Sequence, residues 1–465
     1  MRSDHVNQRN GTGEKPGRCY RLRFNVGCDM AHVLARDFTD ADDLRSEFRD
    51  VWVAGKLGSE VQAAIGIGGQ IWFFMTLFAV ALSAGTTALV SRFWGARDYN
   101  GAIEASRQSL VFSFLFGIVS CTVGLLVARP LYHFLGASAR VESLGWDYLK
   151  FDLLSQVPFT ILWVAHSIFR AKGNPRLPLV VWAIMTAMIV VMDTCFCLNP
   201  LHLGIGGIGL SWLVAGTVGM ILDIILLRRT DMAECVNFMP ILRHGLSKSW
   251  FLRLFHIGIP ACVQDLAWIG GNFVLFEIFA QTPDPTSCQA AWAVGLRIEE
   301  MIAGLPIFAL SMSIGTIVGQ NLGAKQPTRA ELAGWQCAGI AFAYNLVIGL
   351  SMFIFAVPLA QLMSHDQMVT KYTCQYFQIV GLCEPFFALW IVLFGAMQGA
   401  GYTRWPMWIS TLCLVTVRLP LAWFLTVRLG LGPLGCWIAV AFSATLVGLL
   451  AAWRFKSGVW KRQNV

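Results

Sequence analysis

Four acidic residues stand inside long apolar stretches in the second half of the chain, where ionisable groups are rare. They are Asp265, Glu299, Glu300 and Glu384. An ionisable group within a membrane-spanning stretch is costly, and such groups by default mark ion or substrate sites. A carboxyl group beside a cavity can bind and release a proton or a cation as its hydration changes. These four acids are therefore candidate ion-coupling residues.

Arg297 precedes two of these acids by two and three residues. One interpretation is a buried ion pair that fixes helix packing. The other is that Arg297 neutralises one glutamate and leaves the second free for a proton or a cationic compound. Glu384 precedes Pro385, so a role in capping a broken helix competes with ion binding. Arg418, in a later apolar stretch, can pair with any of the acids.

Asp265 follows Pro260 by five residues and has Gln264 beside it. Proline kinks a helix and frees backbone carbonyls, which can then face a cation together with the carboxylate and the amide. The alternative is a polar pair at the point where the helix leaves the membrane. Gln264 is therefore a candidate cavity residue, as is Arg297.

Aromatic residues supply a second kind of candidate contact. Trp72, Phe73 and Trp268 can stack on flat cationic compounds. The chain has 18 tryptophans, however, and they cannot all line one cavity. Contact with lipid or with other helices is the competing interpretation for each aromatic side chain.

The motifs of soluble enzymes are missing from the sequence. The eight histidines form no cluster with metal-ligand spacing, the 13 cysteines include no CxxC, and no GxSxG, HExxH or Walker pattern occurs. We therefore expect no enzymatic activity, no metal and no organic cofactor. The net charge of +8 comes from Lys and Arg spread over loops, without a patch suited to nucleic acid.

Composition indicates a membrane protein. Of 465 residues, 56% are hydrophobic and 13% are charged, whereas soluble domains carry about 25% charged residues. A helix needs ~20 apolar residues to cross the bilayer. Eleven stretches qualify: 61–91, 108–128, 153–169, 177–198, 205–227, 254–279, 290–320, 332–361, 376–398, 405–427 and 434–453.

The distribution of Lys and Arg predicts the orientation. The loops on one side, together with the C-terminal tail, carry 18 of these residues, and the loops on the other side carry 5. The positive-inside rule places the first set, and the C-terminus, in the cytoplasm.

The chain also contains an internal repeat with an offset of 228 residues. Identities recur at this offset over more than 100 residues, mainly at helix ends, and an even number of helices per copy makes the repeats parallel. The matched pairs include Gly95 with Gly323, Pro130 with Pro358, Tyr148 with Tyr376, Gly173 with Gly401 and Gly204 with Gly432. We expect an all-α polytopic membrane protein with two pseudo-symmetric six-helix lobes.

The first lobe is one helix short of that plan, which leaves about 11 helices. The partner of the stretch 254–279 falls at residues 26–51, which hold ten charged residues, and a charge costs ~2.5–3.5 kcal/mol at a helix centre. We interpret residues 1–49 as a polar tail, either real or the product of a wrong start or a shifted frame. We assign the remaining segments as follows: residues 50–227 form the N-lobe, residues 228–253 form a cytoplasmic connection, residues 254–453 form the C-lobe, and residues 454–465 form a cytoplasmic tail.

Four stretches resemble the bacterial branch of the multidrug and toxic compound extrusion (MATE) family. They read DVWVAGKLG from Asp50, ALVSRFWGA from Ala88, IVGQNLGA from Ile317 and MQGAGYTR from Met397. They occur in the family's order over residues 50–453. The resemblance implies two lobes around a cavity that opens to either side in turn. It also implies export of bulky, often cationic compounds, driven by inward flow of protons or sodium.

Asp50 stands where the family places an acidic residue near the end of its first helix, and the resemblance implies a role for it in ion coupling. The segment before Asp50 departs from the family. We expect a multidrug antiporter in the bacterial inner membrane that works as a monomer on small amphipathic or cationic compounds. A flippase for lipid-linked precursors and a non-transporting membrane scaffold are the alternatives.

Overall fold

A computed structural model describes residues 59–134, 138–198, 203–364 and 366–463. The polar tail, the predicted start of the N-lobe and Asp50 lie outside these residues. Every described element of secondary structure is helical. Nine helices in the described ranges are long and apolar enough to cross a membrane, and a bent pair makes a tenth span. Two shorter consecutive helices, at 139–154 and 156–172, cover the one remaining predicted stretch, 153–169.

The N-terminal lobe (N-lobe) comprises the helices before the connection. They are α3 (Ser59–Gly95), α4 (Tyr99–Phe134), α5 (Ala139–Leu154), α6 (Gln156–Lys172), α7 (Arg176–Asp193) with the π turn η1 (Thr194–Leu198), and α8 (Ile205–Arg228). The connection contains a 3-10 turn, η2 (Ala233–Val236), and α9 (Met239–His244). Arg107 on α4 anchors it by donating to the carbonyl of Glu234 at 3.0 Å.

The C-terminal lobe (C-lobe) begins with α10 (Lys248–Ala280). Its other elements are α11 (Pro285–Glu299), the π turn η3 (Glu300–Gly304), α12 (Leu305–Gly323), α13 (Pro327–Ile354), α14 (Ala356–Met363), α15 (Gln367–Val380), α16 (Glu384–Gly399), α17 (Arg404–Leu412), η4 (Cys413–Arg418), α18 (Leu419–Trp423), η5 (Phe424–Arg428), α19 (Pro433–Lys456) and η6 (Val459–Arg462).

The repeat inferred from the sequence is visible in the backbone. With the offset of 228 residues, α4 corresponds to α13 and α14, α6 to α16, and α8 to α19, each beginning within two residues of the expected position. Arg97 and Lys325 are the two described non-glycine residues with positive φ, at 60° and 56°, and they are repeat mates. Gly204 and Gly432 likewise share φ values of 61° and 60°. The two copies therefore turn at the same places in the same way.

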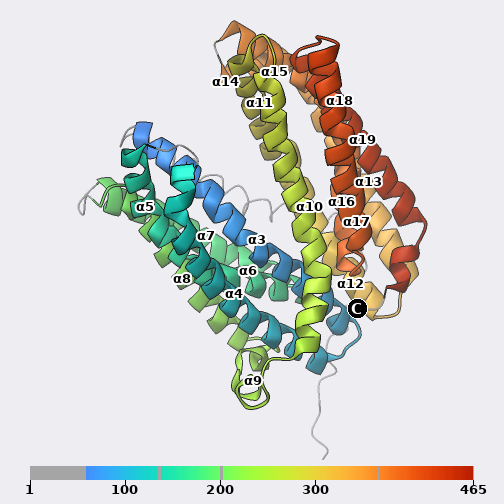
Figure 1. The fold of residues 1–465 in the computed structure, drawn as a ribbon. Coiled ribbons are helices and arrows are strands. Elements are labelled where there is room, and N and C mark those ends of the chain that lie inside the picture. The colour runs from blue at the N-terminus through green and yellow to red at the C-terminus, as the bar shows by residue number, and fades with distance from the viewer. Residues whose placement is uncertain (1–58, 135–137, 199–202, 365, 464–465) are drawn as a thin grey trace, which may run out of the picture.

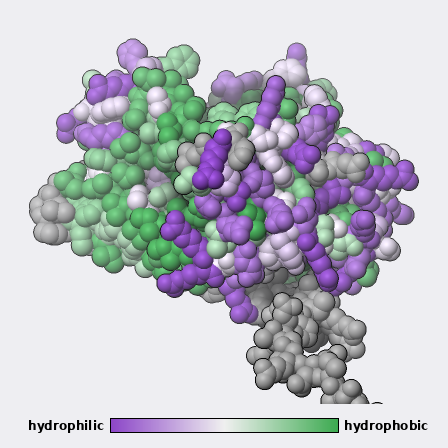
Figure 2. Space-filling model, turned by 90° about the horizontal axis from the view of Figure 1, so that it is seen from below, coloured by the Kyte–Doolittle hydropathy of each residue, from purple (hydrophilic) through white to green (hydrophobic). Residues whose placement is uncertain are grey.

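The two lobes meet at one end and diverge toward the other (Figure 1). They meet near the C-terminus and α9, which is the predicted cytoplasmic side. Seen from that side, hydrophilic side chains gather over the region where the lobes join (Figure 2). The helices of the two lobes therefore lie together on the predicted cytoplasmic side and are further apart on the other side.

Two repeat-related glycines allow the close approach of the lobes. A Cβ on Gly95 would lie 2.0 Å from the carbonyl oxygen of Gln320, and a Cβ on Gly323 would lie 2.0 Å from that of Arg92. Arg92 and Gln320 are themselves repeat mates. The ends of α3 and α12 thus contact each other reciprocally, in a geometry that only glycine permits.

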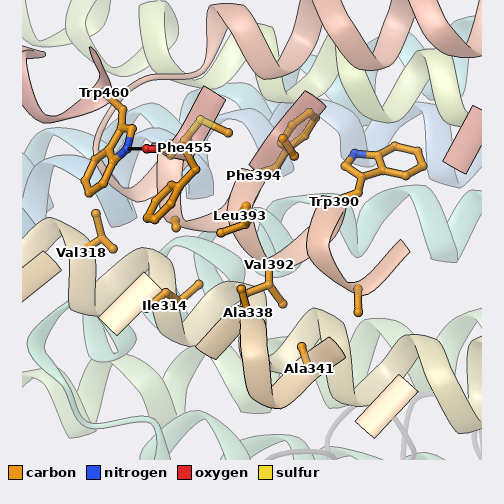
Figure 3. Packing of buried hydrophobic residues seen from close by; sticks show 14 of the residues in the cluster. Ile314, Val318, Ala338, Ala341, Trp390, Val392, Leu393, Phe394, Phe455 and Trp460 are labelled. Carbon is orange, nitrogen blue, oxygen red and sulfur yellow. Dashed lines mark hydrogen bonds between the residues drawn. The ribbon is translucent and has the colours of Figure 1, made fainter. Parts of the chain in front are cut away.

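The C-lobe packs around α16. Trp390, Leu393 and Phe394 of this helix lie among residues of α12, α13 and α19 (Figure 3). Beyond α19 the chain folds back, so that Trp460 stacks on Phe455 with ring centroids 4.6 Å apart and donates to the Phe455 carbonyl at 2.8 Å. The residues after the last span are therefore part of the lobe's core.

Candidate ion-coupling site

Glu299 is buried in the C-lobe at the end of α11. Its side chain accepts a hydrogen bond from the hydroxyl of Tyr376 on α15, which is itself fully buried. The π turn Glu300–Gly304 follows immediately, and such turns interrupt helices preferentially at functional sites. The extra residue in the turn changes the direction in which the following side chains of the span point.

Glu384 lies at a break in the membrane-spanning helix. It begins α16, and α15 and α16 are bent by 60° at the break. Asn345 on α13 donates from Nδ2 to the carboxylate at 2.9 Å and to the backbone carbonyl of Glu384 at 3.3 Å. Glu384 is completely buried, and these contacts join its side chain to a third helix.

The carboxyl groups of Glu299 and Glu384 interact with each other inside the C-lobe. Two negative charges at one buried site repel each other, and a proton on either carboxyl group removes that repulsion. The pair therefore has room for one proton between the spans α11 and α16.

Arg418 supplies the positive charge of this cluster. It is 1% exposed, interacts electrostatically with Glu299, and donates from Nε to the hydroxyl of Ser443 at 2.7 Å. Its guanidinium group also lies 5.3 Å from the ring centre of Trp268 on α10. With one proton on the glutamate pair, the pair and Arg418 together are neutral.

Asp265 and Gln264 lie apart from this cluster, further toward the lobe interface on α10. Both are half-buried. Gln264 accepts a hydrogen bond from Gln398 at 3.3 Å. Within the described ranges, no side chain donates a hydrogen bond to Asp265.

Arg297 does not join the cluster, contrary to the ion pair that the sequence suggested. Its side chain is exposed, and in the described part of the chain it forms no ion pair with Glu299 or Glu300. Residues two apart on an α-helix do not face each other, which keeps Arg297 away from Glu299. Glu300 begins the π turn, where the regular helical spacing that would bring it beside Arg297 ends. Arg418 takes the place that the sequence analysis gave to Arg297, while Glu300 is half-buried beside Glu299.

The aromatic candidates differ in their surroundings. Trp268 contacts Trp390 and Phe387 as well as Arg418. Trp72 packs into the N-lobe against Phe159, with ring centroids 6.0 Å apart, while Phe73 is 39% exposed.

Tyr376, Asn345 and Ser443 complete the site, and the sequence analysis did not propose them as site residues. The repeat contained a signal for Tyr376, because Tyr148 stands at the matching position of the first copy. At the position that matches Glu384, the N-lobe has Gln156, a buried amide that donates to Thr76 at 3.2 Å. In the described residues, no group of three or more His, Cys, Asp or Glu side chains has metal-binding geometry.

Two repeated helical lobes with ionisable groups buried between spans are the architecture of a secondary transporter. The MatE family model matches residues 45–194 and 260–424. The chain therefore belongs to the MATE family of multi-pass membrane transporters. Asp50 lies within the matched region.

Relatives and solved structures agree with this assignment. The chain is 22% identical over 426 residues to a probable multidrug resistance protein NorM of Thermotoga maritima, covering 90% of this chain and 89% of the relative. It is 26% identical over 382 residues to an FAD transporter of Shewanella oneidensis, covering 80% and 82%. The Vibrio cholerae MATE transporter VcmN in its bent form superimposes with a TM-score of 0.85 at 23% identity, covering 92% of this chain and 95% of that one.

Proposed function

We propose that this protein is a secondary active antiporter that exports small amphipathic or cationic compounds in exchange for inward-moving protons. Sodium is the alternative coupling ion, and no organic cofactor takes part. The protein works as a monomer in the bacterial inner membrane, with its C-terminus in the cytoplasm. The observation that supports this proposal best is the buried glutamate pair with Arg418.

Charge balance connects the ion to the cargo. With one shared proton, Glu299 and Glu384 together balance Arg418, and the cluster is neutral. Loss of the proton leaves a net negative charge inside the C-lobe, which a low-dielectric interior tolerates only if water or a cation reaches it. A cationic substrate stabilises the deprotonated, negatively charged cluster, whereas a bound proton stabilises the neutral cluster. Each ligand therefore weakens the binding of the other.

Alternating access completes the cycle. The lobes contact each other at the ends of α3 and α12 and diverge on the opposite side, which suits release of substrate to the outside and entry of the proton. The half-buried Asp265 and Gln264 on α10 line the path between the lobes in this scheme.

The test is ethidium transport in proteoliposomes under an imposed proton gradient or, separately, an imposed sodium gradient. We expect proton-driven transport that is abolished in Glu299→Gln and Glu384→Gln. Glu277→Gln is the matched control, because Glu277 is exposed on α10 and lies outside the cluster. Transport that is unaffected by either cluster variant contradicts the coupling role, and transport under the sodium gradient alone identifies the other ion.

FAD is the second cargo to test. The Shewanella oneidensis relative is named as an FAD transporter, and the partly buried ring of Trp268 is a surface of the kind on which a flavin can stack. Movement of FAD with no movement of ethidium in the same proteoliposomes would replace the cationic substrate class by an anionic one.

A further inference from the structure

A second pair of ionisable side chains is buried in the N-lobe, far from the glutamates in sequence. His166 on α6 and Asp223 on α8 are joined by a contact of 2.9 Å between Nε2 and Oδ2. Their exposed fractions are 2% and 0%. A buried ion pair is weak evidence for stability alone, because removing two charges from water offsets most of their attraction. Histidine is also the side chain whose charge changes most readily near neutral pH.

The surroundings of the pair contain few other charges. Arg170, one turn further along α6, is the other charged group that interacts with Asp223. α7 contributes the ring of Trp182, whose centre lies 6.2 Å from that of His166. Two further ion pairs lie at the predicted cytoplasmic end of the lobe. Lys172 pairs with Asp231 at 3.0 Å, and Arg107 of α4 pairs with Glu104. From α12, Gln320 donates to the Ala171 carbonyl at 2.7 Å.

The pair lies close to the predicted cytoplasmic surface. α6 ends six residues after His166, and α8 ends five residues after Asp223. At a rise of 1.5 Å per residue, the pair is about 8–9 Å from the helix ends. A proton therefore has a short path from that side to the imidazole.

The neighbouring serine links the pair to the contact between the lobes. Ser167, next to His166, is hydrogen-bonded to Ser83 on α3. Two residues to either side of Ser83, α3 contacts α10 of the C-lobe. A Cβ on Gly258 would lie 2.0 Å from the Ala81 carbonyl oxygen, and a Cβ on Gly85 would lie 2.5 Å from that of Leu254. A movement of α6 relative to α8 would therefore be transmitted to the lobe interface.

We propose that His166 and Asp223 form a proton-binding site in the N-lobe, which exchanges protons with the cytoplasmic side and controls the contact of α3 with the C-lobe. This inference rests on the proposed transport function. The imidazole takes a proton from water at the cytoplasmic end and returns it there, so that the pair alternates between imidazolium–carboxylate and imidazole–carboxylate. The protonated pair holds α6 and α8 together, and the deprotonated pair leaves Asp223 balanced by Arg170 alone.

A titration of the imidazole tests the inference without any substrate. The full chain is labelled with ¹⁵N-histidine in lipid nanodiscs, and the His166 signal is assigned as the one lost in His166→Gln. We expect the chemical shift of this signal to change with pH, and we expect the change to disappear or move in Asp223→Asn. His256→Gln assigns a control signal, since His256 is exposed on α10. A His166 signal that stays constant while that of His256 titrates overturns the proposal.

Proteoliposome transport then separates this site from the glutamate pair. With the pH difference across the membrane held constant, we expect transport by His166→Gln to continue but to lose its dependence on the pH of the cytoplasmic side. An unchanged pH profile overturns the proposal, whereas absence of transport in the parent chain refutes the proposed function and leaves the titration as an independent result. If His166→Gln does not fold, the shift of the ¹⁵N signal caused by Trp182→Phe assigns His166 instead.

Discussion

The hydroxyl of Tyr376 on α15 donates a hydrogen bond to the carboxylate of Glu299 on α11. The two residues are 77 positions apart in the chain, and the bond connects two helices that enclose the proposed ion site. Tyr376 therefore determines where the Glu299 carboxylate points, and its removal tests the geometry of the site without removing an acid.

In Tyr376→Phe we expect slower proton-driven transport and a loss of about 1–3 kcal/mol in unfolding free energy, the usual cost of leaving a buried polar group unsatisfied. Transport should persist in part, because Glu384 and Arg418 remain. Ethidium transport and denaturant unfolding in detergent are the measurements. Tyr372→Phe is the matched control, since Tyr372 lies one turn away on the same helix and is only half-buried. Equal effects of both variants would contradict a special role for Tyr376.

The glycine contact between the lobes predicts a conformational effect. In Gly323→Ala, the added methyl group meets the Arg92 carbonyl at 2.0 Å, so we expect the lobes to separate on the predicted cytoplasmic side. The separation is measured by electron double resonance between spin labels on Asn100→Cys and Thr328→Cys. These two residues are exposed repeat mates, and the labels are introduced in a background without reactive cysteines.

The control for this variant is Gly339→Ala, because a Cβ on Gly339 meets no atom within 4 Å. We expect it to leave the label distance unchanged. An identical distance distribution in Gly323→Ala would show that the backbone accommodates the methyl group and that the contact does not hold the lobes closed.

The thiol of Cys235 in the connection is fully buried. Burial raises its pKa from 9.0 to about 12, although Arg107 acts in the opposite direction. Only the thiolate reacts readily with maleimides, so a variant with Cys235 as its single cysteine should label slowly at pH 7–9 when folded and rapidly in SDS. A cysteine at the exposed position Asn237 is the control. Equally fast labelling at both positions would contradict burial of Cys235.

The same shift has a consequence for stability. Below pH 9 the Cys235 thiol stays neutral in both the folded and the unfolded protein, so its full contribution to the free energy of unfolding is present there. Between about pH 9 and pH 12 the unfolded thiol ionises while the folded one does not, so stability falls as pH rises. Cys235→Ala should reduce this alkaline loss, which thermal unfolding measured over that range would detect.

The C-terminal fold-back predicts a large effect of one residue outside the spans. Trp460 is fully buried against Phe455, and truncation of a buried tryptophan costs about 3–5 kcal/mol. We expect Trp460→Ala to lower the unfolding temperature strongly. Trp453→Ala, at a residue that is 62% exposed, should change it little in detergent. Similar temperatures for both variants would contradict the role of the tail in the core.

Much of the fold could be predicted because membrane spans leave a direct signal. Apolar stretches located the helices, and identities such as Gly204 with Gly432 located the turns, since positive φ restricts the residue type. The sequence could not show which side of each helix faces the lobe interior. Arg297 was therefore assigned to the glutamates, whereas Arg418, which is 121 positions away from it, supplies the charge.

The N-lobe pair was missed for a related reason. His166 and Asp223 lie on different helices, and neither stands near a motif. Asp223 lies close to the end of its helix, where a carboxylate can reach water at little cost, so complete burial could not be expected from its position in the sequence. Only the packing of α6 against α8 shows that the two residues are partners.

In the internal repeat, Gln156 of the N-lobe stands at the position that matches Glu384 of the C-lobe, so the two lobes differ in their ionisable groups. Phe394 and Ala451 stand in the C-lobe at the positions of His166 and Asp223, just as an amide replaces the acid in the N-lobe. The two copies therefore share their helices and turns, but they differ in the ionisable side chains that these helices carry. Each half would then sense acidity at a different depth and from a different compartment, although both halves bend at the same turns.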